Sequence, residues 1–221
     1  MWQSLAVELQ DQGFTVLAVA LDTAEAARPW IEAAAPSYPC LIDADHQVAA
    51  LYHLVNVPQA VWIDEAGRIV RPPESAGASD AFRQMDRRTG TLPEAVLAER
   101  NRRKADYLAA VRDWARRGAA SSHALAAPEV AARWSPPTEA QAEAHAWFRL
   151  GRQLQAQGRD DEARSAFDRA TALHPDSWAM WRQTAGKDAR GLAAGADFWA
   201  RVEALGERPY YPPAEIGPAG A

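Results

Sequence analysis

The sequence is short of cysteine, of long apolar runs and of any large excess of charge. Cys40 is its single cysteine, so the chain can form neither an internal disulfide nor a Cys-x-x-Cys pair. No apolar run approaches the roughly 20 residues that a membrane-spanning helix requires. The net charge of −5 provides no basic field for binding nucleic acid. These shortages make nucleic acid a poor candidate partner and exclude a membrane segment from this sequence.

The N-terminus also lacks the features of a secretory signal. Residues 1–5 have neither a charged leading region nor an unbroken apolar core. As given, the chain is expected in the cytoplasm. Export to the periplasm stays open for a longer form, because any signal would then lie upstream. A length of 221 residues can hold one large or two small domains.

The first 75 residues alternate between helix and strand patterns. Apolar residues at helical spacing predict a helix that ends at Gly13, and the apolar run 14–21 predicts a strand buried on both faces. Residues 24–35 predict a helix that Pro29 kinks or restarts. A strand is expected over 40–43 and a further helix over 45–54. This alternation predicts a layered α/β domain.

Residues 58–70 predict a loop followed by a β-hairpin. The run 60–64 is apolar and rich in β-formers, residues 65–67 end in a turn glycine, and 68–70 return as the second strand. Pro58 precedes the first strand, where its missing N–H costs no ladder hydrogen bond. The strand pattern stops at Arg71-Pro72-Pro73, which predicts the start of a linker.

In combination, Leu41-Ile42-Asp43, Val57-Pro58 and the run from Trp62 to Val70 resemble the redoxin branch of the thioredoxin superfamily. That branch includes TlpA/ResA-type thiol-disulfide oxidoreductases and AhpC/TSA proteins, and the resemblance covers about residues 1–75. It implies a cis bond before Pro58. It also implies a substrate-binding loop of Val57, Pro58 and Gln59, in which the backbone of Val57 pairs with an extended partner. The implied substrate is a protein disulfide or a peroxide, and no cofactor is expected.

The same resemblance places a Cys-x-x-Cys pair at the start of a first helix. Matching helix to helix puts this pair within roughly ten residues upstream of Met1, with the first strand farther upstream. We therefore expect an N-terminally truncated domain that is inactive as given and exposes a sheet edge. A misplaced start, a frameshift or a UGA codon read as stop in place of selenocysteine would each produce it. Translating the upstream DNA in the same frame tests this expectation.

Other candidate site residues favour structural roles. Cys40 begins a short apolar strand rather than a helix, so we expect a packed side chain; the alternative is a catalytic thiol. Asp43, Asp45 and His46 precede a helix, which predicts a turn and an N-cap rather than a metal site. His53 is expected to be a polar surface residue, with tuning of a nearby redox centre as the alternative. No metal is expected.

The second half is predicted to be helical. Residues 76–137 predict a connector, with a helix from Pro93 to about Gly118 and a loop over 119–127. Residues 138–206 resemble a tetratricopeptide (TPR) hairpin followed by capping helices, which implies protein partners. Small residues would let its two helices approach, and larger ones would fill the space between them. The matching positions are Trp147, Leu150, Gly151, Leu154, Ala163, Phe167, Ala170 and Pro175. Residues 207–221 predict an extended tail.

The predicted fold is thus an α/β thioredoxin-like domain, over residues 1–75, that lacks its first strand and Cys-x-x-Cys turn, followed by an all-α TPR-like segment. The first functional hypothesis is a thiol-disulfide oxidoreductase or peroxiredoxin-like protein whose redox motif lies upstream. The second is a non-catalytic module that binds proteins through the Pro58 loop and the TPR helices.

Overall fold

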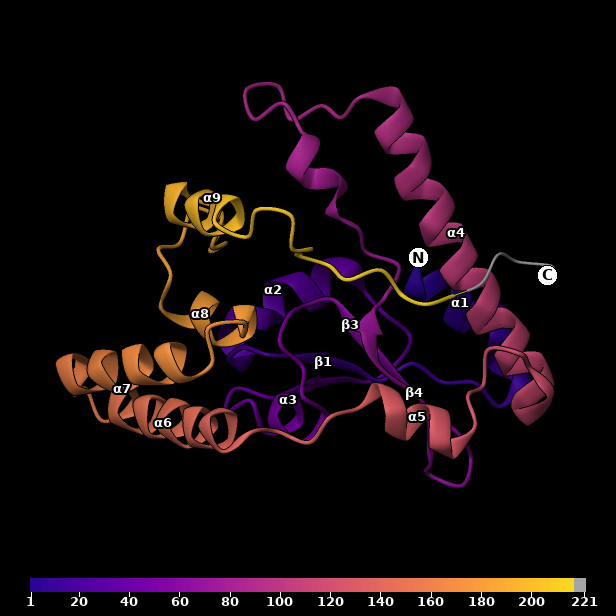
Figure 1. Ribbon diagram of the computed structural model, residues 1–221, viewed down its shortest axis with the longest axis horizontal. Helices are drawn as coiled ribbons and strands as arrows, with labels where there is room; N and C mark the ends of the chain where they lie inside the picture. Colours follow the sequence, from indigo (N-terminus) through magenta and orange to yellow (C-terminus); the bar gives the residue numbers. More distant parts are fainter. Residues whose placement is uncertain (217–221) are drawn as a thin grey trace. The chain divides into compact units, whose positions relative to one another are not determined.

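The computed structural model describes residues 1–216 and divides into two compact units. Unit 1 comprises residues 1–14, 58–134 and those from 200 on, and unit 2 comprises residues 15–57 and 135–199. The two units interleave along the chain and do not coincide with the sequence segments 1–75, 76–137, 138–206 and 207–221. Figure 1 labels the elements, which are described here one unit at a time.

Unit 1 is a β-hairpin packed against helices. Strands β3 (Gln59–Ile63) and β4 (Ile69–Ser75) pair antiparallel around a turn in which Gly67 has φ 76°. Three α-helices and three 3-10 turns complete the unit: α1 (Trp2–Leu9), α4 (Glu94–Arg117), α5 (Ala127–Arg133), η1 (Gln10–Gln12), η2 (Asp80–Gln84) and η3 (Gly118–Ala120). The core places Trp62 of β3 against α1 and α4, in a cluster with Leu5, Leu9, Ala76, Tyr107, Ala110 and Val111.

Unit 2 joins a short parallel strand pair to a helical hairpin. Strands β1 (Ala18–Ala20) and β2 (Cys40–Ile42) pair in parallel, with α2 (Ala24–Ala34) and α3 (Gln47–Tyr52) between and after them. Helices α6 (Glu139–Ala156) and α7 (Asp160–Leu173) lie side by side, and α8 (Trp178–Thr184) follows (Figure 1). Helix α9 (Ala196–Glu203) runs across the boundary between the units.

Each sheet has two strands among the residues that the structure describes. β1 pairs with β2 alone, and β3 pairs with β4 alone. The predicted order of a small α/β region followed by a helical region is confirmed. Within residues 1–216, no helix combines the length and apolar character that crossing a bilayer requires.

The hairpin is longer than the sequence pattern predicts. β4 continues through Arg71, Pro72 and Pro73 to Ser75, where the pattern predicts a linker. In a two-stranded sheet β4 is an edge strand, and an edge tolerates proline because its outer side donates no ladder hydrogen bonds. The pairing also shifts register between Ala60 and Trp62, which absorbs the irregularity.

One further prediction is wrong in its bounds, one of the two alternatives at Pro29 is excluded, and one helix was not predicted. The run 14–21 forms a strand only over Ala18–Ala20. Pro29 lies inside α2 without restarting it, and Thr23 caps that helix by accepting a hydrogen bond from the Ala26 N–H at 3.2 Å. Helix α5 is a helix that the sequence patterns do not predict, since its seven residues hold a single buried apolar side chain, Val130.

Gly151 permits the close approach of α6 and α7. A Cβ atom at this position would lie 2.7 Å from two ring carbons of Phe167. We therefore expect Gly151→Ala to lower the free energy of unfolding by about 1–2 kcal/mol, although alanine favours the helix. Urea denaturation followed by circular dichroism measures the change. Combining it with Phe167→Leu should recover part of the loss; a single variant as stable as the parent would contradict this packing.

Candidate functional site

The start of α3 is organised by one buried carboxylate. Asp43 is 7% exposed, and its side-chain oxygens accept hydrogen bonds from the N–H groups of Gln47, Val48 and Ala49 at 2.7, 2.9 and 3.2 Å. The first helical turn offers these N–H groups no backbone acceptor, so Asp43 acts as the cap of α3. Within residues 1–216 no group of three His, Cys, Asp or Glu side chains could hold a metal ion.

The loop after α3, residues 53–57, is fastened by helix α8. The backbone N–H of Ala179 donates to the Val55 carbonyl at 3.0 Å. Arg182 Nη1 donates to Asn56 Oδ1 at 2.9 Å, and the same oxygen accepts the Val57 N–H at 2.9 Å. Because Asn56 is 4% exposed, this network lies in the interior. We call residues 53–57 the α8-bound loop.

Of the three residues expected to bind substrate, Val57 is the last residue of this loop, and Pro58 and Gln59 come directly after it. Val57 is 40% exposed and ends the segment of unit 2, while Pro58 is exposed and begins the segment of unit 1. Gln59 opens β3 and pairs with Ser75 of β4. Their joint role in binding a substrate, and the cis bond before Pro58, stay predictions.

Helix α8 also reaches the end of β1. Gln183 Nε2 donates to the Leu21 carbonyl at 3.0 Å, one residue beyond the strand. Ser177 caps α8 by accepting the Met180 N–H at 3.3 Å, which fixes where the helix begins. The helix is therefore bonded to two separate segments of the α/β region of unit 2.

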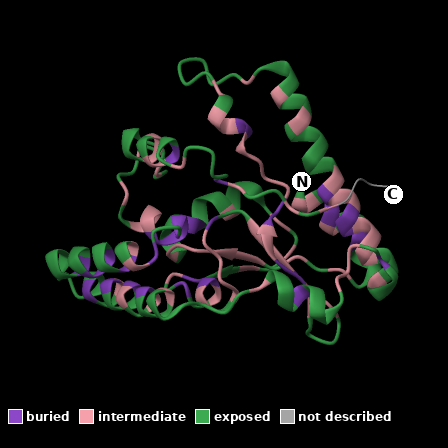
Figure 2. Ribbon diagram, viewed as in Figure 1, coloured by how far each residue is buried: buried purple, intermediate pink, exposed green. Residues whose placement is uncertain are grey.

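The helical hairpin places most of its predicted residues inward. Gly151, Leu154, Ala163, Phe167 and Ala170 are buried, as Figure 2 shows for the facing sides of α6 and α7. Trp147 is partly buried at the edge of this core, and Pro175 is exposed after α7.

One expected packing residue is replaced by another. Leu150 is 43% exposed, so it does not fill the space between the helices. Phe148 does: it is 1% exposed, and its ring centroid lies 5.4 Å from that of Phe167. The spacing of Ala144, Phe148 and Gly151 follows one helical face and could have identified it.

A group of three histidines lies around the same hairpin, and the sequence patterns do not predict that its members lie in one region. The His46 ring is 1% exposed, lies 4.4 Å from the Phe148 ring, and has Nε2 3.3 Å from the Leu21 carbonyl. Its Nδ1 atom is buried without a partner among the described residues. On the hairpin itself, the rings of His145 and His174 meet edge to face at 6.1 Å.

Burial controls the charge of these histidines. It lowers the pKa of His46, and the nearby Leu21 carbonyl and Asp43 only partly oppose this effect. Burial, reinforced by the charge of His174, lowers the pKa of His145 to about 4. Burial also lowers the pKa of His174. All three rings are therefore neutral at physiological pH.

Cys40 occupies an ordinary strand position. It is the first residue of β2, opposite Ala18, and is half-buried. Its thiol donates to the Tyr38 carbonyl at 3.8 Å. Cys40 begins a strand and not a helix, whereas reactive cysteines usually lie at helix N-termini.

Comparison with protein families matches two parts of this chain. The model of the AhpC/TSA family covers residues 2–71. A tetratricopeptide repeat model covers residues 144–185. The chain thus joins a segment similar to the AhpC/TSA family, called here the AhpC/TSA segment, to one similar to a tetratricopeptide repeat, the TPR segment. No curated protein and no solved structure matches it. The predicted redoxin resemblance and the predicted TPR are both confirmed.

The α8 contacts join residues that lie in different family segments. Residues 55–57 lie in the AhpC/TSA segment, whereas Ala179 and Arg182 lie in the TPR segment. The hydrogen bonds between α8 and the α8-bound loop therefore join the two family segments within unit 2.

Acidification should destabilise unit 2. A histidine whose folded pKa lies below the unfolded value of 6.5 contributes stability that is complete above that pH. This stability is lost as the pH falls toward the folded pKa, about 4 for His145. We expect the urea midpoint to fall between about pH 7.5 and about pH 5, and His145→Gln to flatten the dependence. His123→Gln, in unit 1, serves as the control; an unchanged slope in the His145 variant would contradict the assignment.

Proposed function

We propose that this chain is the substrate-docking part of a thiol-disulfide oxidoreductase of the thioredoxin-like superfamily. An AhpC/TSA segment joined to a TPR identifies a thioredoxin-like segment with a protein-interaction module. In the proposal, Val57, Pro58 and Gln59 bind an extended stretch of a protein disulfide substrate. A cysteine or selenocysteine motif upstream of Met1 supplies the redox chemistry.

The cysteine content supports a separate source of redox chemistry. Disulfide exchange begins when a thiolate attacks one disulfide sulfur, forms a mixed disulfide and releases the other sulfur as a thiolate. A second thiolate of the enzyme then attacks the enzyme sulfur of the mixed disulfide, which releases the second substrate thiolate and leaves the enzyme oxidised to a disulfide. This chain has one cysteine, half-buried on β2. It therefore lacks the second thiol that completes a two-thiol exchange.

The contact between α8 and the α8-bound loop supports a docking role most directly. Two hydrogen bonds from the TPR segment, those of Ala179 and Arg182, hold the backbone carbonyl of Val55 and the side chain of Asn56. A protein held by the TPR helices would thus be held beside the segment that leads into Pro58. The same observation favours a second candidate function, a non-catalytic binding module, because neither contact requires a thiol.

The chain alone should show no redox turnover. We expect reduction of insulin disulfides by dithiothreitol, and removal of hydrogen peroxide, to run at the rate without protein. Cys40→Ser is the matched control and should behave identically. Turnover that disappears in Cys40→Ser would contradict the proposal and assign the chemistry to Cys40. Turnover that appears only when the upstream reading frame is restored would favour the oxidoreductase over the non-catalytic module.

Arg182 should strengthen peptide binding through the loop. Arg182→Met removes a charged donor from buried Asn56, which corresponds to about 1.5–3 kcal/mol, or binding weaker by roughly 10- to 160-fold. Fluorescence anisotropy with labelled, alkylated insulin B chain measures the affinity. Arg190→Met is the control, since Arg190 pairs with Asp188 at 3.0 Å and is exposed. Equal affinities of the two variants would show that the α8-bound loop does not contribute to peptide binding.

A further inference from the structure

Residues 207–216, here called the C-terminal tail, lie in unit 1 without helix or strand. The tail is nevertheless bound through its backbone. The carboxylate of Asp80 accepts the N–H groups of Tyr210 and Tyr211 at 2.9 and 2.7 Å. The Ser75 hydroxyl donates to the Pro212 carbonyl. Main-chain recognition combined with side-chain pockets is how proteins bind extended peptides.

The side chains of the tail are also recognised. Tyr210 is 3% exposed, and its ring packs edge to face on Phe82 at 5.0 Å. Tyr211 contacts the same Phe82 ring at 6.1 Å. Farther along, Ala214 and Ile216 pack against the core that contains Trp62 and Tyr107. Tyr-Tyr-Pro-Pro therefore fits the site through two aromatic rings, and its prolines favour the extended form.

The main anchor of the site does not depend on the tail. Arg71 is 2% exposed and donates to the Glu215 carbonyl at 3.1 Å. Its other donors hold both oxygens of Glu74, at 2.8 and 3.0 Å, and the His123 carbonyl at 3.0 Å. Its guanidinium also lies 5.3 Å from the centre of the Trp62 ring. Because these partners lie outside the tail and hold Arg71, this donor requires little reorganisation to bind a peptide.

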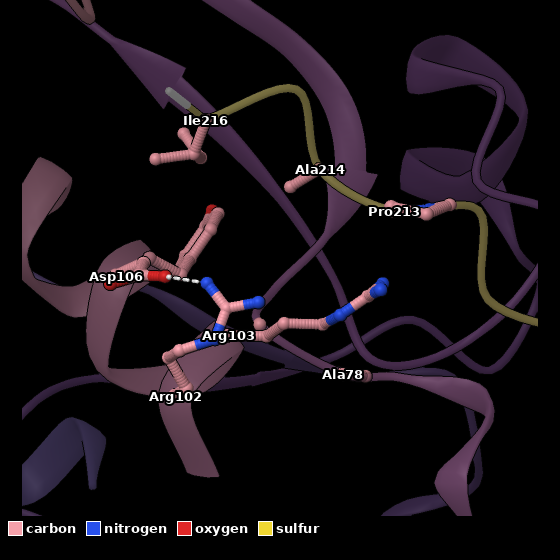
Figure 3. Close-up of a pocket in the computed structure, with 9 residues that line it drawn as sticks. Ala78, Arg102, Arg103, Asp106, Pro213, Ala214 and Ile216 are labelled. Atoms are coloured by element: carbon pink, nitrogen blue, oxygen red, sulfur yellow. Dashed lines mark hydrogen bonds and ion pairs between the residues drawn. The ribbon is translucent and has the colours of Figure 1, made fainter. Parts of the chain in front are cut away.

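Space remains beside the bound tail. A pocket of about 280 Å³ is lined by Pro213, Ala214 and Ile216 of the tail and by residues of helix α4. Figure 3 shows these tail residues facing Arg102 and Asp106, which pair at 3.4 Å. The tail thus leaves room for side chains larger than Ala214.

We propose that this surface is a binding site for extended Tyr-Tyr-Pro-Pro-containing segments of partner proteins, and that the tail is a ligand carried within the chain. We call it the tail groove; its residues are Arg71, Ser75, Asp80, Phe82, Trp62 and Tyr107. The proposal goes beyond the docking function above, because it concerns unit 1 alone and requires no redox chemistry. A tail in the same chain has an effective concentration on the order of millimolar, so a partner must displace it.

A labelled peptide of residues 207–216 tests the proposal with the full chain. The variant Tyr210→Ala with Ile216→Ser removes two tail side chains but leaves the groove intact. Fluorescence anisotropy should show the peptide binding this variant at least tenfold more tightly than the parent chain. Adding Asp80→Asn should reverse the gain, because it removes the charge that accepts two peptide N–H groups. Asp86→Asn, which alters an exposed turn carboxylate of the same unit, is the control and should not reverse it.

Two outcomes would overturn the proposal. The first is a tail variant that keeps the circular dichroism spectrum of the parent and does not bind the peptide. The second is a parent chain in which excess peptide leaves hydrogen exchange at Tyr210 and Tyr211 unchanged. The second measurement needs no substitution, so it applies even where the variant does not fold. Faster exchange at these two amides, with a scrambled peptide inert, would support displacement of the tail.

Discussion

A two-stranded sheet is marginally stable in water, and the α/β part of this chain contains two of them. Each must therefore be stabilised by helices. In unit 1, α4 supplies Tyr107, whose hydroxyl accepts the Trp62 indole N–H at 2.9 Å, and Trp114, which stacks on Trp62 at 5.0 Å. In unit 2, α8 bonds to the end of β1 and to the α8-bound loop. Helices from outside the AhpC/TSA segment complete both cores.

The buried charges of unit 1 follow from the same constraint. β4 contributes Arg71 and Glu74 to a surface that α5 and the tail also cover, so the pair is taken out of water. Two hydrogen bonds between them and the face of Trp62 compensate for the lost hydration. Burial raises the pKa of Tyr107, which keeps its hydroxyl neutral beside this pair. Replacing either residue alone would leave the charge of the other buried without its ion-pair partner. We therefore expect a single substitution at Arg71 or Glu74 to be more destabilising than replacement of both residues.

Sequence patterns predicted the elements better than their partners. The alternation up to residue 54 and the hairpin around Gly67 rest on local rules, and both are found. Strand β4 is longer than predicted because a strand tolerates proline only on its unpaired side. Which side stays unpaired depends on the tertiary structure and not on the local sequence. Asp43 was predicted as part of a turn and cap because capping is local. The contacts of α8, the histidine group and the tail groove join residues up to 162 positions apart, and no local pattern encodes such contacts.

A single helical repeat cannot cover both of its faces, because repeats are normally stabilised by neighbours of the same kind. Here the AhpC/TSA segment takes the place of a neighbour: the His46 ring lies against Phe148 of α6, and α8 bonds to Val55 and Asn56. A partner that repositions α8 must break the bonds of Ala179 and Arg182, and so must change the α8-bound loop. If such a partner changes the affinity of the loop for a ligand, linkage requires that the ligand change the affinity of the repeat for that partner by the same factor. The two segments are therefore coupled through a contact that either one alone would lack.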